Sequence, residues 1–335
     1  MSTKAITVLG AGSWGTALAI RLAANMNPVC LWGHEPGCMQ TLATERQNRQ
    51  FLPGFDFPDR LSIETDLAAA IGASRDLLLV VPSHAFREVL VNAMPSFGEN
   101  TRIAWATKGL ETGSGKFMQE VLEEVVGDQY PAAVISGPTF AREVAAGLPT
   151  ALTVASTNPP FANDLASRLH GDMMRVYTSD DVVGVQLGGT VKNVLAIASG
   201  ITDGLKLGAN SRAALITRGL AEIIRLGDAM GARRETLMGL SGVGDLILTC
   251  TDDQSRNRRL GLALGQGKPL ELAVQEIGQV VEGFNTAREV VQLARKYKVE
   301  LPIAEQVFRV LHENLPPAAA VNNLLARDIK SETGI

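Results

Sequence analysis

One lysine in the second half of the chain has surroundings that would change its chemistry. On a helix, the neighbours of Lys192 one turn away would be Gly188, Gly189, Leu195 and Ala196. None of these is acidic, and a lysine among small and apolar side chains loses solvation, which disfavours its charged form. Such a lysine can give and take protons near neutral pH. We therefore predict proton transfer for Lys192; the alternative is a lysine whose stem crosses a helix edge to reach water.

Two polar clusters follow in the same half of the chain. Asp245 comes after the glycine-rich stretch Gly242-Val243-Gly244. Its carboxylate could orient a substrate hydroxyl, pair with Lys192, or cap a helix. The second cluster, Ser255-Arg256-Asn257-Arg258-Arg259, brings guanidinium and amide groups close together. Such groups suit a phosphate, and the alternative for them is a solvated basic face.

The first fifteen residues predict a dinucleotide site. Ala5–Leu9 is a short apolar run typical of a buried strand, and small and apolar residues at helical spacing fill Thr16–Ala23. Between them stands Gly10-Ala-Gly12-Ser-Trp-Gly15. Gly10 allows a tight turn, Gly12 lets a pyrophosphate approach the backbone, and Gly15 lets the helix pack close to the sheet. The helix amino terminus would then face the phosphates.

The end of the second expected strand, Val29–Trp32, bears on the cofactor. An NAD-specific site places an acidic residue there to hold the ribose 2′-hydroxyl. Gly33 and His34 stand in that place. Because nothing there strongly repels a 2′-phosphate, we predict that NADP is used at least as well as NAD. The alternative for His34 is that it only caps the strand end.

Polar loops follow three further expected strands, Leu77–Val81, Arg102–Ala106 and Ala132–Ile135. In an open α/β sheet, ligands bind beyond the carboxyl ends of the strands. Lys108 follows the second of these strands and could meet a phosphate or carbonyl oxygen, or be a surface lysine. Gly137-Pro138-Thr139 follows the third and opens a helix whose N–H groups could hold an anion. The alternative is an ordinary helix cap by Thr139 or Ser136.

The pattern changes after about residue 180. Short β-branched runs give way to long amphipathic stretches at 213–230, 286–297 and 303–312. We predict a Rossmann-type α/β domain over residues 1–190 and an all-helical domain over residues 191–335. Two further strands, at 150–155 and 173–177, are expected before the change.

Composition limits the class of protein. The chain has 335 residues, 46% of them hydrophobic, and a net charge of −4. This balance argues against a nucleic-acid or anionic-membrane binder. Three scattered cysteines show no metal-ligand spacing and fit a reducing cytosol. We expect no signal peptide, no membrane span and no metal site.

Taken together, the motifs resemble the bacterial NAD(P)-dependent sn-glycerol-3-phosphate dehydrogenases over nearly the full length. The matching stretches are Gly10–Gly15, Ala106–Glu111, Ile135–Ala141, Lys192-Asn193, Gly244–Leu246, Ser255–Arg258 and Val280–Gly283. The resemblance implies a helical second half like that of 6-phosphogluconate dehydrogenase. It also implies reversible reduction of dihydroxyacetone phosphate to sn-glycerol 3-phosphate, the backbone for phospholipids. A cytoplasmic enzyme, commonly a homodimer, is expected.

The resemblance also assigns roles to residues. Lys192 matches the proton-transfer lysine of the family. The matched substrate contacts are Lys108, Gly137, Thr139, Lys192, Asp245, Ser255, Arg256 and Asn257. The matched cofactor contacts are Ser13, Trp14, His34, Lys108, Ala141, Arg256, Val280 and Glu282, besides the glycines of the first turn.

Two other functions stay open from the residues alone. One is a hydroxyacid or 6-phosphogluconate dehydrogenase of the same architecture, which needs a carboxylate site where the Ser255–Arg259 cluster suits a phosphate better. The other is a non-catalytic NADPH-binding sensor. A sensor needs no proton donor, and Lys192 and Asp245 argue against it.

Overall fold

The protein is described by a computed structural model that covers residues 5–329 and 331–332. By close packing the chain separates into two compact units. The nucleotide unit holds the residues up to Thr107 and those from Lys116 to Val182. The helical unit holds Lys108–Gly115 and the residues from Val183 on. The predicted domain division after residue 190 stays a prediction; that residue lies within one continuous helix, α8 (Val182–Gly204).

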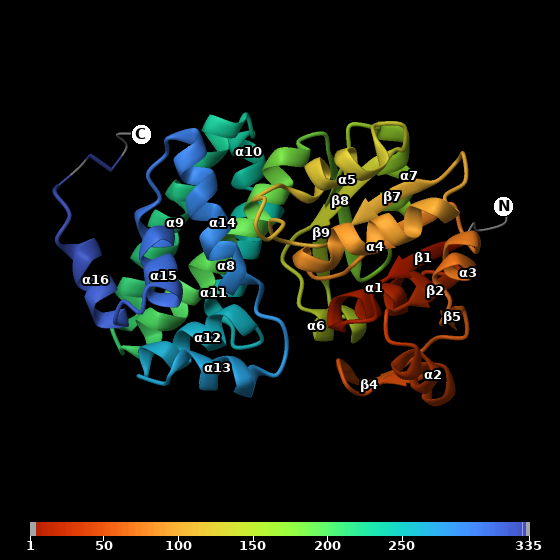
Figure 1. Ribbon diagram of the computed structural model, residues 1–335, viewed down its shortest axis with the longest axis horizontal. Helices are drawn as coiled ribbons and strands as arrows, with labels where there is room; N and C mark the ends of the chain where they lie inside the picture. The colour runs from red at the N-terminus through yellow and green to blue at the C-terminus, as the bar shows by residue number, and fades with distance from the viewer. Residues whose placement is uncertain (1–4, 330, 333–335) are drawn as a thin grey trace. The chain divides into compact units, whose positions relative to one another are not determined.

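An eight-stranded sheet forms the centre of the nucleotide unit (Figure 1). Its order is β10-β9-β8-β7-β6-β1-β2-β5. The strands are β1 (Ile6–Leu9), β2 (Val29–Trp32), β5 (Leu61–Glu64), β6 (Asp76–Leu79), β7 (Arg102–Trp105), β8 (Ala132–Ser136), β9 (Thr150–Ala155) and β10 (Met174–Ser179). Neighbours are parallel except β8 and β9. The chain order reverses beside β1, between β2 and β6, so the switch point at which such sheets bind ligands lies at the end of β1.

Helices cover the sheet in the way that parallel crossovers require. The helices of this unit are α1 (Ser13–Ala24), α2 (Pro36–Glu45), α3 (Leu67–Gly72), α4 (Phe86–Ala93), α5 (Met118–Val126), α6 (Ala141–Ala145) and α7 (Pro159–Leu169). Helix α1 packs against α6 and α7, whereas α4 packs against α3 and α5. Strands β1, β2 and β6 are buried along their whole length, and this explains their continuous apolar runs.

Ion pairs close the amino edge of the sheet, opposite the glycine turn. Asp76 begins β6 and is 2% exposed. Its Oδ2 lies 2.8 Å from Nη2 of Arg102 on β7 and 2.8 Å from Nη2 of Arg168 on α7. A buried carboxylate held by two guanidinium groups ties two strands and a helix together at the edge away from the ligand side.

The region from residue 37 to 64 differs from the sequence prediction. The polar stretch over residues 37–48 predicts a helix, but α2 ends at Glu45 because Arg46 takes a left-handed conformation, with φ of 55°. The stretch over residues 51–58, which carries prolines and aromatic residues, predicts a loop, but it contains β4 (Leu52–Asp56), which pairs with β3 (Gln47–Asn48). Its Pro53 and Gly54 indicated a loop, yet proline is tolerated on such an edge. The edge strand β5 was missed, because it is short and carries polar Ser62 and Glu64.

The helical unit is built around α8, in which most residues from Gly184 to Thr202 are buried. The other helices are α9 (Gly208–Met230), α10 (Arg234–Leu237), α11 (Asp245–Thr251), α12 (Arg256–Gly265), α13 (Leu270–Ile277), α14 (Glu282–Tyr297), α15 (Pro302–His312) and α16 (Pro317–Leu325). Figure 1 shows α8 running among them. Helix α8 is long and apolar enough to cross a membrane, but 94% of its most apolar window is buried inside the protein, as in a core helix.

Candidate active site

The glycine turn after β1 fits a pyrophosphate. Gly10 has φ of +125°, and a Cβ there would lie 2.3 Å from the carbonyl oxygen of Val80. A Cβ on Gly15 would lie 1.9 Å from the carbonyl oxygen of Gly10. A Cβ on Gly12, by contrast, would have no described atom within 4 Å. Gly10 and Gly15 therefore serve the turn itself, whereas the bare backbone of Gly12 leaves space for a ligand.

The start of α1 is arranged to receive an anion. Gly12 is its N-cap and supplies no side-chain cap to the first N–H groups. Ser13 Oγ donates to the carbonyl oxygen of Phe51 at 2.6 Å, which fixes the first turn against the following loop. Trp14 and Ala141, two of the matched cofactor residues, pack against the apolar core of the unit. The uncapped N–H groups and the helix dipole then favour negative charge at this end.

The packing at the end of β2 explains why residue 33 is a glycine, which the sequence did not. A Cβ at position 33 would lie 2.8 Å from Sδ of Met39 and 3.1 Å from Cβ of Ala11. An acidic side chain therefore cannot be placed at 33 without displacing its neighbours. The side chain of His34 is 81% exposed, with Nε2 3.4 Å from Oε1 of Glu35. His34 thus presents an exposed imidazole at this strand end.

Gly137 and Thr139 follow β8 at the same carboxyl edge of the sheet, since β1, β6, β7 and β8 are parallel. Gly137 has φ of +148°, and a Cβ there would lie 2.8 Å from Cα of Leu152. Thr139 Oγ1 donates to the carbonyl oxygen of Gly137 at 3.2 Å. The alternative of a side-chain cap for α6 is wrong, because its N-cap is Phe140 and no side chain caps it.

In the helical unit, two lysines meet one buried carboxylate. Asp245 begins α11 and is 0% exposed. Lys192 on α8 donates to its Oδ1, and Lys108 donates to its Oδ2 at 2.7 Å. Lys192 also donates to Oγ1 of Thr249 at 3.0 Å. Of the three alternatives that the sequence left for Asp245, the structure shows pairing with Lys192.

Burial and the neighbouring charges shift the pKa of Lys192 in this cluster. Burial lowers the pKa of Lys192 to about 8, against the opposing attraction of Asp245 and with the help of the Lys108 ammonium. A lysine whose pKa lies near 8 exchanges a proton readily at physiological pH. The alternative of a lysine that reaches water is wrong, since Lys192 is only 7% exposed.

Close backbone packing brings Asp245 to Lys192. A π-helical turn, Leu240–Gly244, precedes Asp245. A Cβ on Gly188 of α8 would lie 2.3 Å from the carbonyl oxygen of Ser241 in that turn. A Cβ on Gly242 would lie 1.9 Å from the carbonyl oxygen of Leu237. Without a side chain at Gly188, α8 can lie directly against the turn, one helical turn before Lys192, and without one at Gly242 the turn itself can close on Leu237.

The Ser255–Arg259 cluster is only partly a free basic surface. Ser255 is the N-cap of α12, and its Oγ accepts from the N–H of Arg258 at 3.2 Å. Asn257 donates to Oδ1 of Asn193 at 2.9 Å and accepts from the N–H of Gly283 at 2.9 Å. Arg258 is 8% exposed and donates to Oδ2 of Asp203 at 2.6 Å. The cluster is therefore held to α8 and α14, and the alternative of a wholly solvated face is wrong.

Arg256 lies beside the two remaining cofactor candidates. Its Nη1 donates to Oε1 of Gln279 at 3.3 Å. Burial lowers the pKa of Arg256, while Glu282 at the start of α14 favours its charged form. Val280 is 42% exposed. Arg256, Val280 and Glu282 thus share one region, at the amino ends of α12 and α14.

The comparisons with known proteins agree over both halves of the chain. The family model described as the N-terminus of NAD-dependent glycerol-3-phosphate dehydrogenase matches residues 5–162, and the C-terminus model matches residues 181–322. A protein of Shewanella frigidimarina named glycerol-3-phosphate dehydrogenase (NAD(P)+) is 57% identical over 329 residues, 98% of this chain and 97% of that protein. This chain belongs to the NAD-dependent glycerol-3-phosphate dehydrogenase family.

Solved structures of the family share the fold. A crystal structure of glycerol-3-phosphate dehydrogenase from Coxiella burnetii is 51% identical and has a TM-score of 0.94, covering 97% of this chain and 99% of that one. The glycerol-3-phosphate dehydrogenase of Saccharomyces cerevisiae is 27% identical, with a TM-score of 0.82 over 96% of this chain and 99% of that one. The predicted family, fold class, oxidoreductase activity and cofactors, NAD and NADP, are confirmed.

Three residues that contact the predicted site residues were not themselves predicted as site residues. Lys192 donates to Thr249, Asn257 donates to Asn193, and Arg256 donates to Gln279. Thr249 lies four residues after Asp245, a spacing that places both on one helix face and could have indicated it. Gln279 carries no such signal, and although Asn193 stands in a matching stretch, its contact with Asn257 on α12 cannot be read from the sequence.

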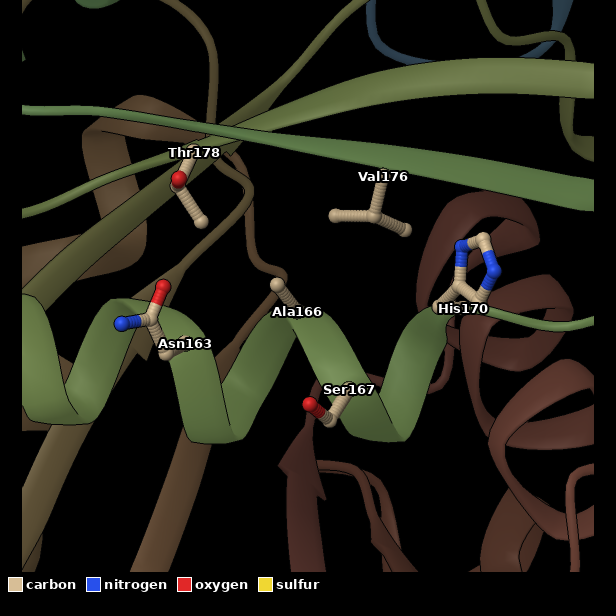
Figure 2. Close-up of a pocket in the computed structure, with 6 residues that line it drawn as sticks. All are labelled: Asn163, Ala166, Ser167, His170, Val176 and Thr178. Carbon is tan, nitrogen blue, oxygen red and sulfur yellow. The ribbon is translucent and has the colours of Figure 1, made fainter.

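One hollow lies apart from the residues that the sequence analysis assigned to substrate and cofactor. It has a volume of about 570 Å³ between α7 and β10 in the nucleotide unit. Figure 2 shows its lining: Asn163, Ala166, Ser167, His170, Val176 and Thr178. Val176 and Thr178 lie within β10, on the sheet edge separated from β1 by β9, β8, β7 and β6. It is therefore not the ligand site expected at the end of β1.

Among residues 5–329, 331 and 332, no group of three or more His, Cys, Asp or Glu could hold a metal ion.

Proposed function

We propose that Lys192 is the proton-transfer group when this enzyme interconverts dihydroxyacetone phosphate and sn-glycerol 3-phosphate. The observation that carries the proposal is the buried cluster of Lys192, Asp245 and Lys108. When bound, NADPH or NADH supplies the hydride that adds to C2 of the ketone. The chain has to supply a proton to the carbonyl oxygen, and protonated Lys192 donates it from Nζ. In the opposite direction, neutral Lys192 accepts the proton of the C2 hydroxyl.

Asp245 and Lys108 prepare Lys192 for this role. Asp245 accepts from both ammonium groups and so fixes where Lys192 Nζ lies. Lys108 adds a second positive charge that stabilises negative charge developing on the carbonyl oxygen. Its charge also keeps the pKa of Lys192 low, so that the proton is easily released. Holding these groups in advance reduces the reorganisation that the reaction needs.

The nucleotide is assigned to the glycine turn. The N–H groups at the start of α1, with Gly10, Gly12, Ser13, Trp14 and Gly15, would hold the pyrophosphate, as the open space at Gly12 supports. His34 would meet the 2′-phosphate of NADP. Further contacts are proposed for Ala141, Arg256, Val280, Glu282 and Lys108.

The substrate phosphate is assigned to the amino terminus of α12. Arg256 supplies a guanidinium, and the helix dipole adds positive potential. The oxygen of Ser255 Oγ caps the helix, but its hydroxyl proton can still be donated to a phosphate oxygen. Asn257 uses one amide hydrogen on Asn193, so its second amide hydrogen can also be donated to the phosphate. Gly137 and Thr139 are proposed as further substrate contacts. We also propose that the enzyme is a cytoplasmic homodimer that supplies glycerol 3-phosphate for phospholipid synthesis.

The phosphate assignment is tested by oxidation of NADPH, followed at 340 nm, with dihydroxyacetone phosphate or dihydroxyacetone. We expect the unphosphorylated ketone to be a very poor substrate. Arg256→Ala should raise KM for the phosphate by about ten- to a hundredfold, since a charge-assisted contact contributes roughly 1.5–3 kcal/mol. Arg259, which is exposed, serves as the control, and Arg259→Ala should leave KM unchanged. Equal activity on both ketones would contradict the assignment.

A further inference from the structure

A second buried carboxylate of the helical unit meets the segment that carries Lys108. We call residues Lys108–Gly115 the strap; it belongs to the helical unit. Glu289 on α14 is 1% exposed, and its Oε1 accepts from the N–H of Gly113 in the strap at 3.1 Å. Hydrogen bonds thus join the strap to the helices of its own unit at Lys108, on Asp245, and at Gly113, on Glu289.

The strap needs such a support. Three of its residues, Gly109, Gly113 and Gly115, have positive φ of 143°, 89° and 67°. Glycine gives the backbone more freedom than any other residue, so a segment with three of them loses more conformational entropy when it is ordered. The N–H of Gly115 donates to the carbonyl oxygen of Glu111 at 3.0 Å, which bends the segment locally but does not tie it to a helix.

Burying the carboxylate of Glu289 costs free energy of folding. A buried carboxylate needs hydrogen bonds to offset its lost hydration. Among the described residues its Oε2 has no hydrogen-bond partner, and it would lie 3.6 Å from a Cβ on Gly115. An apolar side chain would fill the same space without that cost. The acceptor that Glu289 offers to Gly113 is what an apolar residue could not supply.

We propose that Glu289 is a positioning residue: its carboxylate anchors the strap through Gly113 and so holds the Lys108 ammonium against Asp245. This inference rests on the proposed roles of Lys108 and Lys192. Glu289 does not touch the reacting atoms and acts through Lys108. Loosening the strap should therefore have the same consequences as removing the charge of Lys108, in weaker form.

The test compares pH profiles of kcat for ketone reduction at saturating substrate. Because the Lys108 charge lowers the pKa of Lys192, Lys108→Met should move the alkaline limb to higher pH. Glu289→Ala should move it in the same direction and lower kcat by about ten- to a hundredfold, the cost of a misplaced catalytic group. Glu289→Gln keeps a carbonyl oxygen that accepts from Gly113, so this variant should keep the wild-type pH profile. In the double variant with Lys108→Met, Glu289→Ala should add little.

Glu222 supplies the matched control. It is likewise a carboxylate buried in the helical unit, 2% exposed, and it accepts from the N–H groups of Ile303 and Ala304 at the start of α15. Glu222→Ala should lower Tm but leave the pH profile unchanged. If Glu289→Ala does not fold, Glu289→Asp keeps the charge, shortens the reach and should shift the profile in the same direction.

The outcomes separate the two proposals. A shift with Lys108→Met but none with either Glu289→Ala or Glu289→Asp overturns the inference alone, as does full additivity in the double variant. An unchanged profile and kcat in Lys108→Met itself overturns the proposed role of Lys108, whatever Glu289 does. The inference is supported if Lys108→Met and Glu289→Ala shift the pH profile in the same direction. It also requires that Glu289→Gln and Glu222→Ala keep the wild-type profile.

Discussion

At the scale of single residues, the cluster around Asp245 holds two lysines on one carboxylate. If both were charged, a buried site would carry a net positive charge, and that is unfavourable in a poorly solvated place. Lys192 is 7% exposed, and this burial lowers its pKa. The arrangement thus makes the proton of Lys192 easier to release, as the proposed proton transfer requires.

Lys192→Met tests the exchangeable proton. Methionine keeps the volume of the stem and removes the amine. Because a contact made only in the transition state is lost, kcat at saturating substrate should fall by about a hundred- to ten-thousandfold. Tm should not fall, since Asp245 keeps Lys108 as its partner. NADPH binding, followed by fluorescence titration, should be retained. A folded, NADPH-binding variant with near-normal kcat would end the proposal.

The two neighbours of Lys192 should shift its titration in opposite directions. In the wild type, ketone reduction needs the protonated amine and should decline as pH rises through about 8. Lys108→Met removes a like charge and should move this limb to higher pH, whereas Asp245→Asn removes the opposite charge and should move it to lower pH. Measuring kcat against pH for all three proteins checks this, and shifts of the same sign in both variants would contradict it.

At the scale of elements, glycines set how closely backbones approach. Gly200 and Gly204 of α8 face Gly261 and Gly265 of α12. A Cβ on Gly261 would lie 2.0 Å from the carbonyl oxygen of Ile197, and one on Gly200 would lie 2.1 Å from that of Arg258. This contact brings the first turn of α12, with Asn257, to Asn193 on α8. The spacing of four residues within each pair is visible in the sequence, but their meeting is not.

Two alanine variants in the glycine turn should separate folding from binding. Gly15→Ala places a methyl 1.9 Å from the Gly10 carbonyl oxygen and should lower the free energy of unfolding by roughly 1–3 kcal/mol. Gly12→Ala meets no described protein atom, so Tm should stay near that of the wild type. Its NADPH affinity should weaken by on the order of tenfold or more, because the methyl occupies the path of the pyrophosphate. Calorimetry and NADPH titration measure both effects; normal NADPH affinity in Gly12→Ala would contradict the assignment.

At the scale of the whole molecule, Glu222 links stability to pH. Burial raises its pKa from 4.5 to about 7, against the backbone N–H groups of Ile303 and Ala304 and the charges of Arg225 and Arg327. The folded state therefore binds the proton more tightly than the unfolded state. This contribution to stability is fully present below pH 4.5 and is lost as pH rises through about 7.

Glu222→Gln should remove that dependence. Between pH 4.5 and 7, the free energy of unfolding of the variant should fall less with rising pH than that of the wild type. Urea unfolding at several pH values measures the slopes, and the comparison of slopes is independent of any constant loss from the changed side chain. Identical slopes in the two proteins would show that Glu222 does not titrate in this range.

The sequence by itself determined the βαβ start, the change from α/β to helical, and the family. These features are local: apolar runs, glycine spacing and helical periodicity are properties of neighbouring residues. It also indicated that Lys192 lacks a charged partner on its own helix. The early end of α2 and the short strands β3, β4 and β5 were missed, because their pairing depends on partners elsewhere in the chain.

Only the tertiary structure decided which polar groups meet. Lys108, Lys192 and Asp245 come from three distant parts of the chain, and their shared contact rests on the close approach of α8 to the turn before Asp245. The structure also explained Gly33, whose missing side chain makes room for Met39 and Ala11. Side-chain chemistry can be read from residue types, but a lowered pKa, a buried ion pair and a close backbone contact depend on distance and burial, which arise only when separate elements pack together.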